Sequence, residues 1–282
     1  MTRPHKHTCV GLGLELMRRW RCLEHSFSGL GAATALLSCE EGIKDIDLYV
    51  TYARGPHEIL APDKEHVLVG IQIELDGRRG LLIGDPGYHI GRIVTVMRDR
   101  GYPHTGWFNQ TKEDDTTRDY HYKYNKINSN YIEWHNRQIR NEESKYTTAL
   151  IYVSRPYCDA IRITEKRNLV YRLKSFVTRD PMGQVMAGLS FVVKSTFDDI
   201  ELSLFYHMNE KRRKFKIKMK ELKNMDSLDE TTLEHINICN SQMKLPPKYL
   251  LSILKQVYSA LSDQSFTIQC LEINAHIGQL CI

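Results

Sequence analysis

A hairpin signal constrains this chain more than any other feature of its sequence. Two runs rich in apolar residues, 66–75 and 80–84, flank the pair Asp76-Gly77. An Asp-Gly pair between two such runs is the strongest short-range signal for a tight turn between antiparallel strands. The sequence therefore predicts a hairpin whose open end lies at the start of the first run and the end of the second.

The open end of this hairpin carries a histidine and an aspartate. His66 begins the first run, and Asp85 directly follows the second. Antiparallel strands place residues at similar distances from the turn opposite each other. We therefore expect the two side chains to lie near one another, to within a register shift of about two residues.

A cysteine precedes the hairpin in a stretch with helical spacing. Apolar residues recur three and four positions apart at Leu30, Ala33, Leu36 and Leu37. This spacing predicts a helix within 10–42, with Gly42 as its C-terminal cap. Cys22 falls at the N-terminal side of the pattern, where unpaired backbone N–H groups and the helix dipole stabilise a thiolate and an oxyanion.

These three residues have the side chains of a thiol catalytic triad. A nucleophilic cysteine needs a base to take its proton, and the base needs an acceptor that fixes its orientation. The sequence predicts Cys22 as nucleophile, His66 as base and Asp85 as the orienting carboxylate. Structural alternatives are a buried apolar cysteine and a hydrogen-bonded strand histidine. Residues 85–87 would then be a simple turn in which Gly87 has positive φ.

The rest of the chain is expected to form three segments. Residues 1–45 would be helical and carry the nucleophile, 46–200 would be a β-rich domain, and 201–282 a C-terminal α/β portion. Within the middle segment, 109–148 is polar with little periodicity, which predicts a surface insertion. Further strands are expected at 48–52, 148–153, 168–177 and 185–193, and a final helix at 249–261.

Charge and composition exclude several classes of protein. The chain of 282 residues has a net charge of +5, and its apolar runs are far shorter than the ~20 residues that cross a bilayer. It begins without the apolar block of a secretory signal, and its seven cysteines are scattered, so a reducing, cytoplasmic location without a membrane partner is expected.

The lysine row in 211–220 is interpreted as a protected edge strand, or alternatively as a surface for an anionic partner. Few stacking aromatic residues accompany it, so no nucleic-acid partner is expected.

The N-terminus contains His5, His7 and Cys9 at alternating positions, a spacing that metal ligands can have. No fourth ligand is evident nearby. A frayed tail is the preferred interpretation, and no metal site is expected.

Three segments resemble the arylamine N-acetyltransferases. Residues 22–27, Cys-Leu-Glu-His-Ser-Phe, are similar to the family's Cys-x-Glu-x-Asn segment, which carries the nucleophile at the start of a helix. Residues 66–69 resemble the family's histidine followed by an apolar strand, and 81–88 resemble its strand ending in Asp-x-Gly-aromatic. The three segments follow one another in the family's order.

This resemblance implies an α+β protein of papain-like architecture, with an N-terminal helical segment, a central antiparallel barrel or sheet and a C-terminal α/β portion. It implies that Cys22 accepts an acetyl group from acetyl-coenzyme A and passes it to an arylamine or another amine, with His66 as base and Asp85 as its partner. Residues that bind coenzyme A and the oligomeric state stay unassigned.

Two other functions fit the same residues. Transglutaminase-like proteins also carry Cys, His and Asp in this order, which would make the chain a cysteine amidase or peptidase. The acetyltransferases approach their nucleophile through Arg-Gly-Gly, whereas this chain has bulky residues at 18–21. If Trp20 and Arg21 block the thiol, the chain is a non-catalytic binding protein of the same fold.

Overall fold

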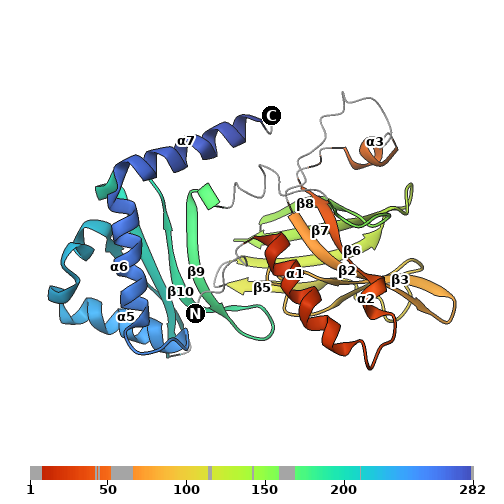
Figure 1. The fold of residues 1–282 in the computed structure, drawn as a ribbon, viewed down its shortest axis with the longest axis horizontal. Helices are drawn as coiled ribbons and strands as arrows, with labels where there is room; N and C mark the ends of the chain where they lie inside the picture. Colours follow the sequence, from red (N-terminus) through yellow and green to blue (C-terminus); the bar gives the residue numbers. More distant parts are fainter. Residues whose placement is uncertain are drawn as a thin grey trace. The chain divides into compact units, whose positions relative to one another are not determined.

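The computed structural model of the chain describes residues 8–41, 43, 45–51, 66–113, 116–141, 143–158, 169–209 and 211–280. It is a mixed α/β structure with a curled antiparallel sheet and several helices, and it divides into two compact units, Met1–Lys166 and Arg167–Ile282 (Figure 1). The expected boundaries near 45 and 200 differ from this division. One strand from the expected helical segment pairs with strands of the β-rich segment, and strands on either side of residue 200 share one sheet.

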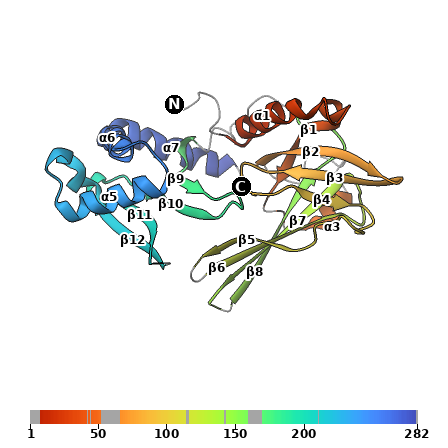
Figure 2. The same ribbon diagram turned by 90° about the horizontal axis from the view of Figure 1, so that it is seen from below.

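The first unit is built on an eight-stranded antiparallel sheet in the order β4-β3-β2-β1-β8-β7-β6-β5. Its strands are β1 (Thr34–Glu40), β2 (His66–Leu75), β3 (Arg78–Gly84), β4 (Val94–Met97), β5 (Phe108–Glu113), β6 (Thr116–Tyr124), β7 (Tyr131–Arg140) and β8 (Glu143–Tyr152). The edge strand β4 contacts β6, which lies next to the other edge, so the sheet curls around its core (Figure 2). That core includes Leu68, Ile83, Ile132 and Trp134.

Helix α1 (Cys9–Trp20) covers the other face of β1 and β2 (Figure 2). Gly13 allows the helix to approach closely, because a Cβ there would lie 2.7 Å from Leu36 Cδ2. Further along the same helix face, Trp20 packs against Gly84 of β3. The described part of this unit also contains the short elements η1 (Arg21–Leu23), α2 (Leu30–Ala33) and α3 (Ile46–Thr51).

The predicted hairpin is confirmed. Strands β2 and β3 pair in antiparallel register, with Leu75 opposite Arg78. Asp76 and Gly77 have φ values of 51° and 74°, the left-handed conformations that a tight turn of this kind requires.

Three other expectations for this unit are wrong. The helix expected within 10–42 ends at Trp20, and Leu36 and Leu37 lie in β1, a central strand buried on both faces whose apolar run has no visible period of two. Residues 46–51 form α3 rather than a strand, because the Asp45 carboxylate accepts a hydrogen bond from Leu48 N–H at 2.9 Å and caps the turn. The expected insertion at 109–148 instead supplies most of β5 to β8. The expected Gly42 cap lies outside the described residues.

The second unit is a four-stranded sheet in the order β12-β11-β10-β9 with helices on one face (Figure 1). Its elements are β9 (Leu173–Arg179), β10 (Val185–Val192), η2 (Phe197–Asp199), β11 (Glu201–Met208), β12 (Lys211–Lys218), η3 (Met219–Ser227), α5 (Glu230–Gln242), α6 (Tyr249–Ser262) and α7 (Gln264–Leu280). The basic run is an edge strand, as expected, and the helix expected at 249–261 is α6. None of the helices in the described part of the chain combines the length and apolar character that a membrane span needs.

Candidate active site

His66 and Asp85 form a buried pair at the open end of the β2–β3 hairpin. The register pairs Val69 with Gly84, which brings the two side chains to nearby positions. His66 Nε2 lies 2.9 Å from Asp85 Oδ2, and the two residues are only 4% and 1% exposed. Asp85 Oδ1 accepts a second hydrogen bond from Tyr88 N–H at 3.0 Å. Both carboxylate oxygens are therefore held in place.

The thiol that contacts this pair is Cys9, the first residue of α1. Its side chain lies next to His66 beside Gly87, raises the pKa of the imidazole, and is partly exposed. The helix begins here because the Thr8 hydroxyl accepts a hydrogen bond from Gly11 N–H at 3.1 Å. The structure thus brings together a cysteine, a histidine and an aspartate, with Cys9 in the place expected for Cys22.

Gly87 leaves the space in which the side chains of Cys9 and His66 approach each other. A Cβ at this position would lie 2.6 Å from His66 Cε1 and 3.2 Å from Cys9 Cβ. The φ of Gly87 lies outside the left-handed region, so the expectation of a positive φ here is wrong. The glycine is needed because two side chains approach its backbone closely.

The first turn of α1 places backbone donors beside the Cys9 thiol. The first intrahelical hydrogen bond runs from Leu12 N–H to the Thr8 carbonyl at 2.9 Å. The N–H groups of Cys9 and Val10 precede it and lie at the positive end of the helix dipole. Donors in this position stabilise a thiolate and an oxyanion that forms next to it.

Burial and neighbouring charge shift the pKa of His66 in opposite directions. Burial lowers the pKa of His66, whereas the Asp85 carboxylate and its hydrogen bond raise this pKa, and Cys9 acts in the same direction as Asp85. The raising effects prevail, so the pKa of His66 lies well above its ordinary value. The site therefore stabilises the imidazolium, which is the partner that a thiolate needs.

Two aromatic residues hold the His66 ring from the core side. The Tyr88 ring meets His66 edge to face, with 4.6 Å between centroids, and Trp134 packs on Tyr88 at 4.8 Å. The Tyr88 hydroxyl is hydrogen-bonded to Glu41, and Gln110 Nε2 donates to the Tyr88 carbonyl at 3.3 Å. These contacts fix the plane of the imidazole.

Two other cysteines near these elements lack this arrangement. Cys39 lies opposite His66 in the β1–β2 register, but its side chain is 0% exposed, and burial followed by the charge of Glu41 raises the pKa of its thiol. Cys22 is exposed in η1, directly after α1. It lies about 19 Å beyond Cys9 along the helix axis, at the negative end of the dipole.

The prediction that Cys22 begins a helix beside His66 and Asp85 is therefore wrong. The apolar spacing that suggested one helix after Cys22 is divided between two elements. Leu30 and Ala33 lie in the single-turn helix α2, and Leu36 and Leu37 lie in strand β1. Trp20 does not block a nucleophile either, because its ring anchors the far end of α1 against Gly84. Arg21 is exposed in η1.

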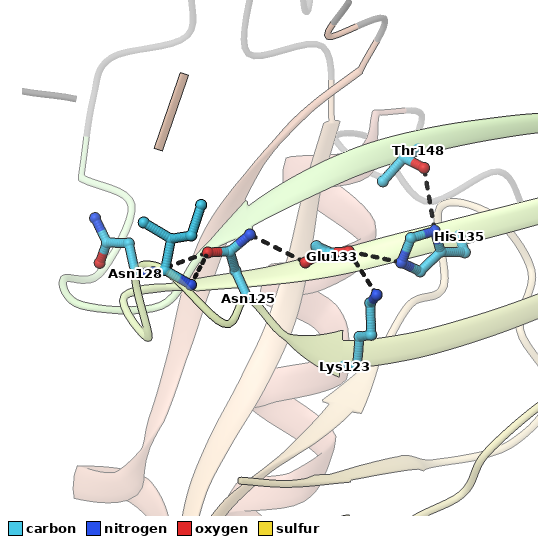
Figure 3. Close-up of polar contacts among 7 residues, drawn as sticks. Lys123, Asn125, Asn128, Glu133, His135 and Thr148 are labelled. Carbon is cyan, nitrogen blue, oxygen red and sulfur yellow. Dashed lines mark hydrogen bonds and ion pairs between the residues drawn. The ribbon is translucent and has the colours of Figure 1, made fainter. Parts of the chain in front are cut away.

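A second histidine with triad-like contacts lies on the outer face of β7 (Figure 3). His135 Nδ1 is 3.1 Å from Thr148 Oγ1, and Nε2 is 2.8 Å from Glu133 Oε2. Asn125 donates to Glu133 at 3.0 Å, and Lys123 pairs with it at 3.0 Å. Burial raises the pKa of Glu133, but His135 and Lys123 prevail and lower it to about 2.

This second group lacks the features that activate a nucleophile. Thr148 lies within β8 directly opposite His135, in a continuous ladder with β7. Backbone N–H groups in such a ladder are taken up by the neighbouring strand, whereas those at a helix N-terminus are available to an oxyanion. The group is therefore interpreted as a charge-paired network that joins three strands.

Among the described residues, no group of three or more His, Cys, Asp or Glu side chains is arranged to hold a metal ion. His5 and His7 lie outside the described residues.

A scan against protein-family models and searches of curated proteins and solved structures give no significant match to this chain. The case for a function rests on the geometry of the Cys9, His66 and Asp85 side chains.

One sequence signal would have identified Cys9. Thr8 is a favoured N-cap residue, and the positions after it repeat at helical spacing. Cys9, Gly13, Leu16 and Trp20 share one helix face. A cysteine on the buried face, directly after a cap, has the position that a helix-activated thiol requires.

Proposed function

We propose that the protein is a thiol-dependent acyltransferase in which Cys9 is the nucleophile, His66 the base and Asp85 the orienting carboxylate. The observation that carries this proposal is the buried His66 ring, which contacts the Cys9 thiol and, through Nε2, the Asp85 carboxylate. With Nε2–H donating to Asp85, Nδ1 is the nitrogen available to take the thiol proton.

The reaction would proceed in two steps, acylation of Cys9 and transfer of the acyl group to an amine. The Cys9 thiolate attacks the carbonyl carbon of an acyl thioester, and the N–H groups of Cys9 and Val10 stabilise the oxyanion. The intermediate collapses with loss of the donor thiolate, which takes the proton from His66. An amine then attacks the acyl-cysteine, His66 accepts the amine proton, and the Cys9 thiolate leaves.

The resemblance of residues 66–69 and 81–88 to segments of the arylamine N-acetyltransferases supports acetyl-coenzyme A as donor and an arylamine or another amine as acceptor. Residues 22–27, the third similar segment, do not contribute to the site. In those enzymes the nucleophile starts a helix, a property that Cys9 has and Cys22 lacks. The order Cys, His, Asp along the chain is retained with Cys9 in the first place, which also supports a papain-like architecture for the first unit. The same triad serves cysteine amidases, so the acceptor must be tested.

The test is to trap the acyl-enzyme. After incubation of the full chain with acetyl-coenzyme A, mass spectrometry of peptides should find one acetyl group on Cys9, and a subsequent addition of aniline should remove it as acetanilide. Cys9→Ser should abolish the adduct, and the matched variant Cys22→Ser should retain it. Acetylation of Cys22 alone, or none at all, would refute the proposal, and release of ammonia from glutamine peptides would favour the amidase.

A further inference from the structure

A second feature of the first unit is an open cavity far from Cys9. It has a volume of about 640 Å³ and is lined by residues of β2 and β3, the end of α2, and the segments around 98, 129 and 153. Gln72 on its wall lies six residues beyond His66 along β2, which is about 20 Å for an extended strand. The cavity is therefore separate from the thiol site.

Apolar residues make up most of the wall of a smaller cavity beside this one. The smaller cavity has a volume of about 100 Å³ and shares Ala33, Gln72, Leu81 and Val153 with the larger one. Its remaining wall includes Ala32, Ala35, Leu37 and Gly70. Small side chains on α2 and β1 leave this space, and its surfaces suit a hydrocarbon chain or ring.

The lining carries more positive than negative charge. Arg79 and Arg98 line the larger cavity together with the carboxylate of Glu74, and Arg155 lines the smaller cavity. Arg79 pairs with Glu74 at 3.6 Å. Arg98 instead lies over the Tyr124 ring, 5.3 Å from its centroid.

The neutral polar groups of the lining are donors as well. Arg155 lines the smaller cavity and interacts with Tyr152. Asn130, Ser129 and Ser154 line the larger cavity, and each can donate to an oxyanion. Guanidinium groups with amide and hydroxyl donors are the set that recognises carboxylate or phosphate oxygens.

We propose that this cavity binds a small amphipathic anion, with its apolar part between α2 and β1 and its oxyanion head between Arg79 and Arg98. The volume is in the range that holds a small organic ligand. Carboxylate and phosphate heads share the chemistry that the arginines recognise. The site is independent of the proposed acyl transfer.

Isothermal titration calorimetry of the full chain with octanoate, octyl phosphate and 1-octanol tests the proposal. At least one of the two anions should bind tenfold or more tightly than octanol, and the tighter anion identifies the head group. Arg98→Gln should weaken anion binding at least tenfold without affecting octanol, and Arg98→Lys should weaken it less. Ala33→Leu, which fills the shared wall, should weaken all three ligands.

Matched controls make the outcome decisive. Arg213→Gln, an exposed arginine on β12 of the second unit, should bind the anion like the unmodified protein. Protein alkylated at Cys9 should also bind it unchanged, so that failure here is distinct from failure of the thiol chemistry. The proposal is overturned if octanol binds as well as both anions, if neither anion binds, or if Arg98→Gln and Arg213→Gln behave alike.

Discussion

At the residue scale, His66 connects every part of the proposed site. Its ring contacts the Cys9 thiol and the Asp85 carboxylate, and Tyr88 packs against its face. Because the ring is only 4% exposed, its position is fixed by packing rather than by water. Small changes at this point should therefore alter the reactivity of the thiol strongly.

Gly87→Ala tests the close approach of Cys9 and His66. The added methyl group would lie 2.6 Å from His66 Cε1, so the ring must move. We expect the rate of Cys9 alkylation by iodoacetamide at neutral pH to fall at least tenfold, as measured by peptide mass spectrometry. Gly31→Ala, where the nearest atom is a flexible Glu24 oxygen at 3.3 Å, is the matched control. Equal rates in the two variants would show that Cys9 and His66 do not act together.

Asp85→Asn tests the charge that raises the pKa of His66. In the native protein the raised pKa of His66 keeps the imidazolium paired with the carboxylate at neutral pH. The pair's contribution to stability is complete below about pH 6.5 and is lost as pH rises through the raised pKa of His66. Cys9 alkylation should therefore depend little on pH between about 6 and 8. In Asp85→Asn we expect a slower reaction that accelerates with pH, as for an ordinary thiol. A parallel pH profile in both proteins would contradict this role.

At the element scale, helix α1 and the β2–β3 hairpin each supply part of the site. The hairpin was predictable because an Asp-Gly turn and two flanking apolar runs determine the register and hence the pairing of His66 with Asp85. The cysteine was assigned wrongly, although the Thr8 cap before Cys9 was visible in the sequence. The apolar run of β1 is buried on both faces and carries no period of two, so it was mistaken for part of a helix after Cys22. Strands β5 to β7 and the first half of β8 were missed because one face carries polar residues that join strands, which resembles a loop composition.

Thr8→Ala tests the start of α1. Loss of the cap should lower the free energy of unfolding by about 1 kcal/mol and slow Cys9 alkylation, because the first turn is no longer held in place. Thr8→Ser keeps the accepting oxygen and should preserve both quantities. Urea unfolding and alkylation kinetics measure them, and an unaffected alkylation rate in Thr8→Ala would exclude a role of the helix start.

Glu133→Gln tests the network across β6 to β8. The lowered pKa of Glu133 means that its ion pairs stabilise the fold above about pH 4.5, and that this contribution is lost as pH falls toward 2. The variant should therefore lose about 2 kcal/mol of unfolding free energy at pH 7 and little at pH 2. Glu143→Gln, exposed at the start of β8, should change it by less than about 0.5 kcal/mol. An equal loss at both pH values in urea titrations would contradict the charge argument.

At the scale of the whole molecule, each unit encloses its own core. Leu204 and Ile151 are both 0% exposed but belong to separate clusters, one in each unit. Leu204→Ala should cost about 3 kcal/mol and speed amide exchange in β10 to β12 while β2 and β3 stay protected. Ile151→Ala should give the reverse pattern. Hydrogen exchange read by mass spectrometry checks both, and uniform acceleration along the chain would show a single cooperative unit.

We expect the reactive thiol of this protein to be that of Cys9. The most direct measurement is the alkylation rate of Cys9 relative to Cys22 in the native protein at about pH 6, where an isolated thiol is almost fully protonated. Although Cys22 is the more exposed residue, we expect Cys9 to react at least tenfold faster, and to lose this advantage in His66→Ala. If Cys22 reacts as fast as Cys9 or faster, the proposed site is wrong.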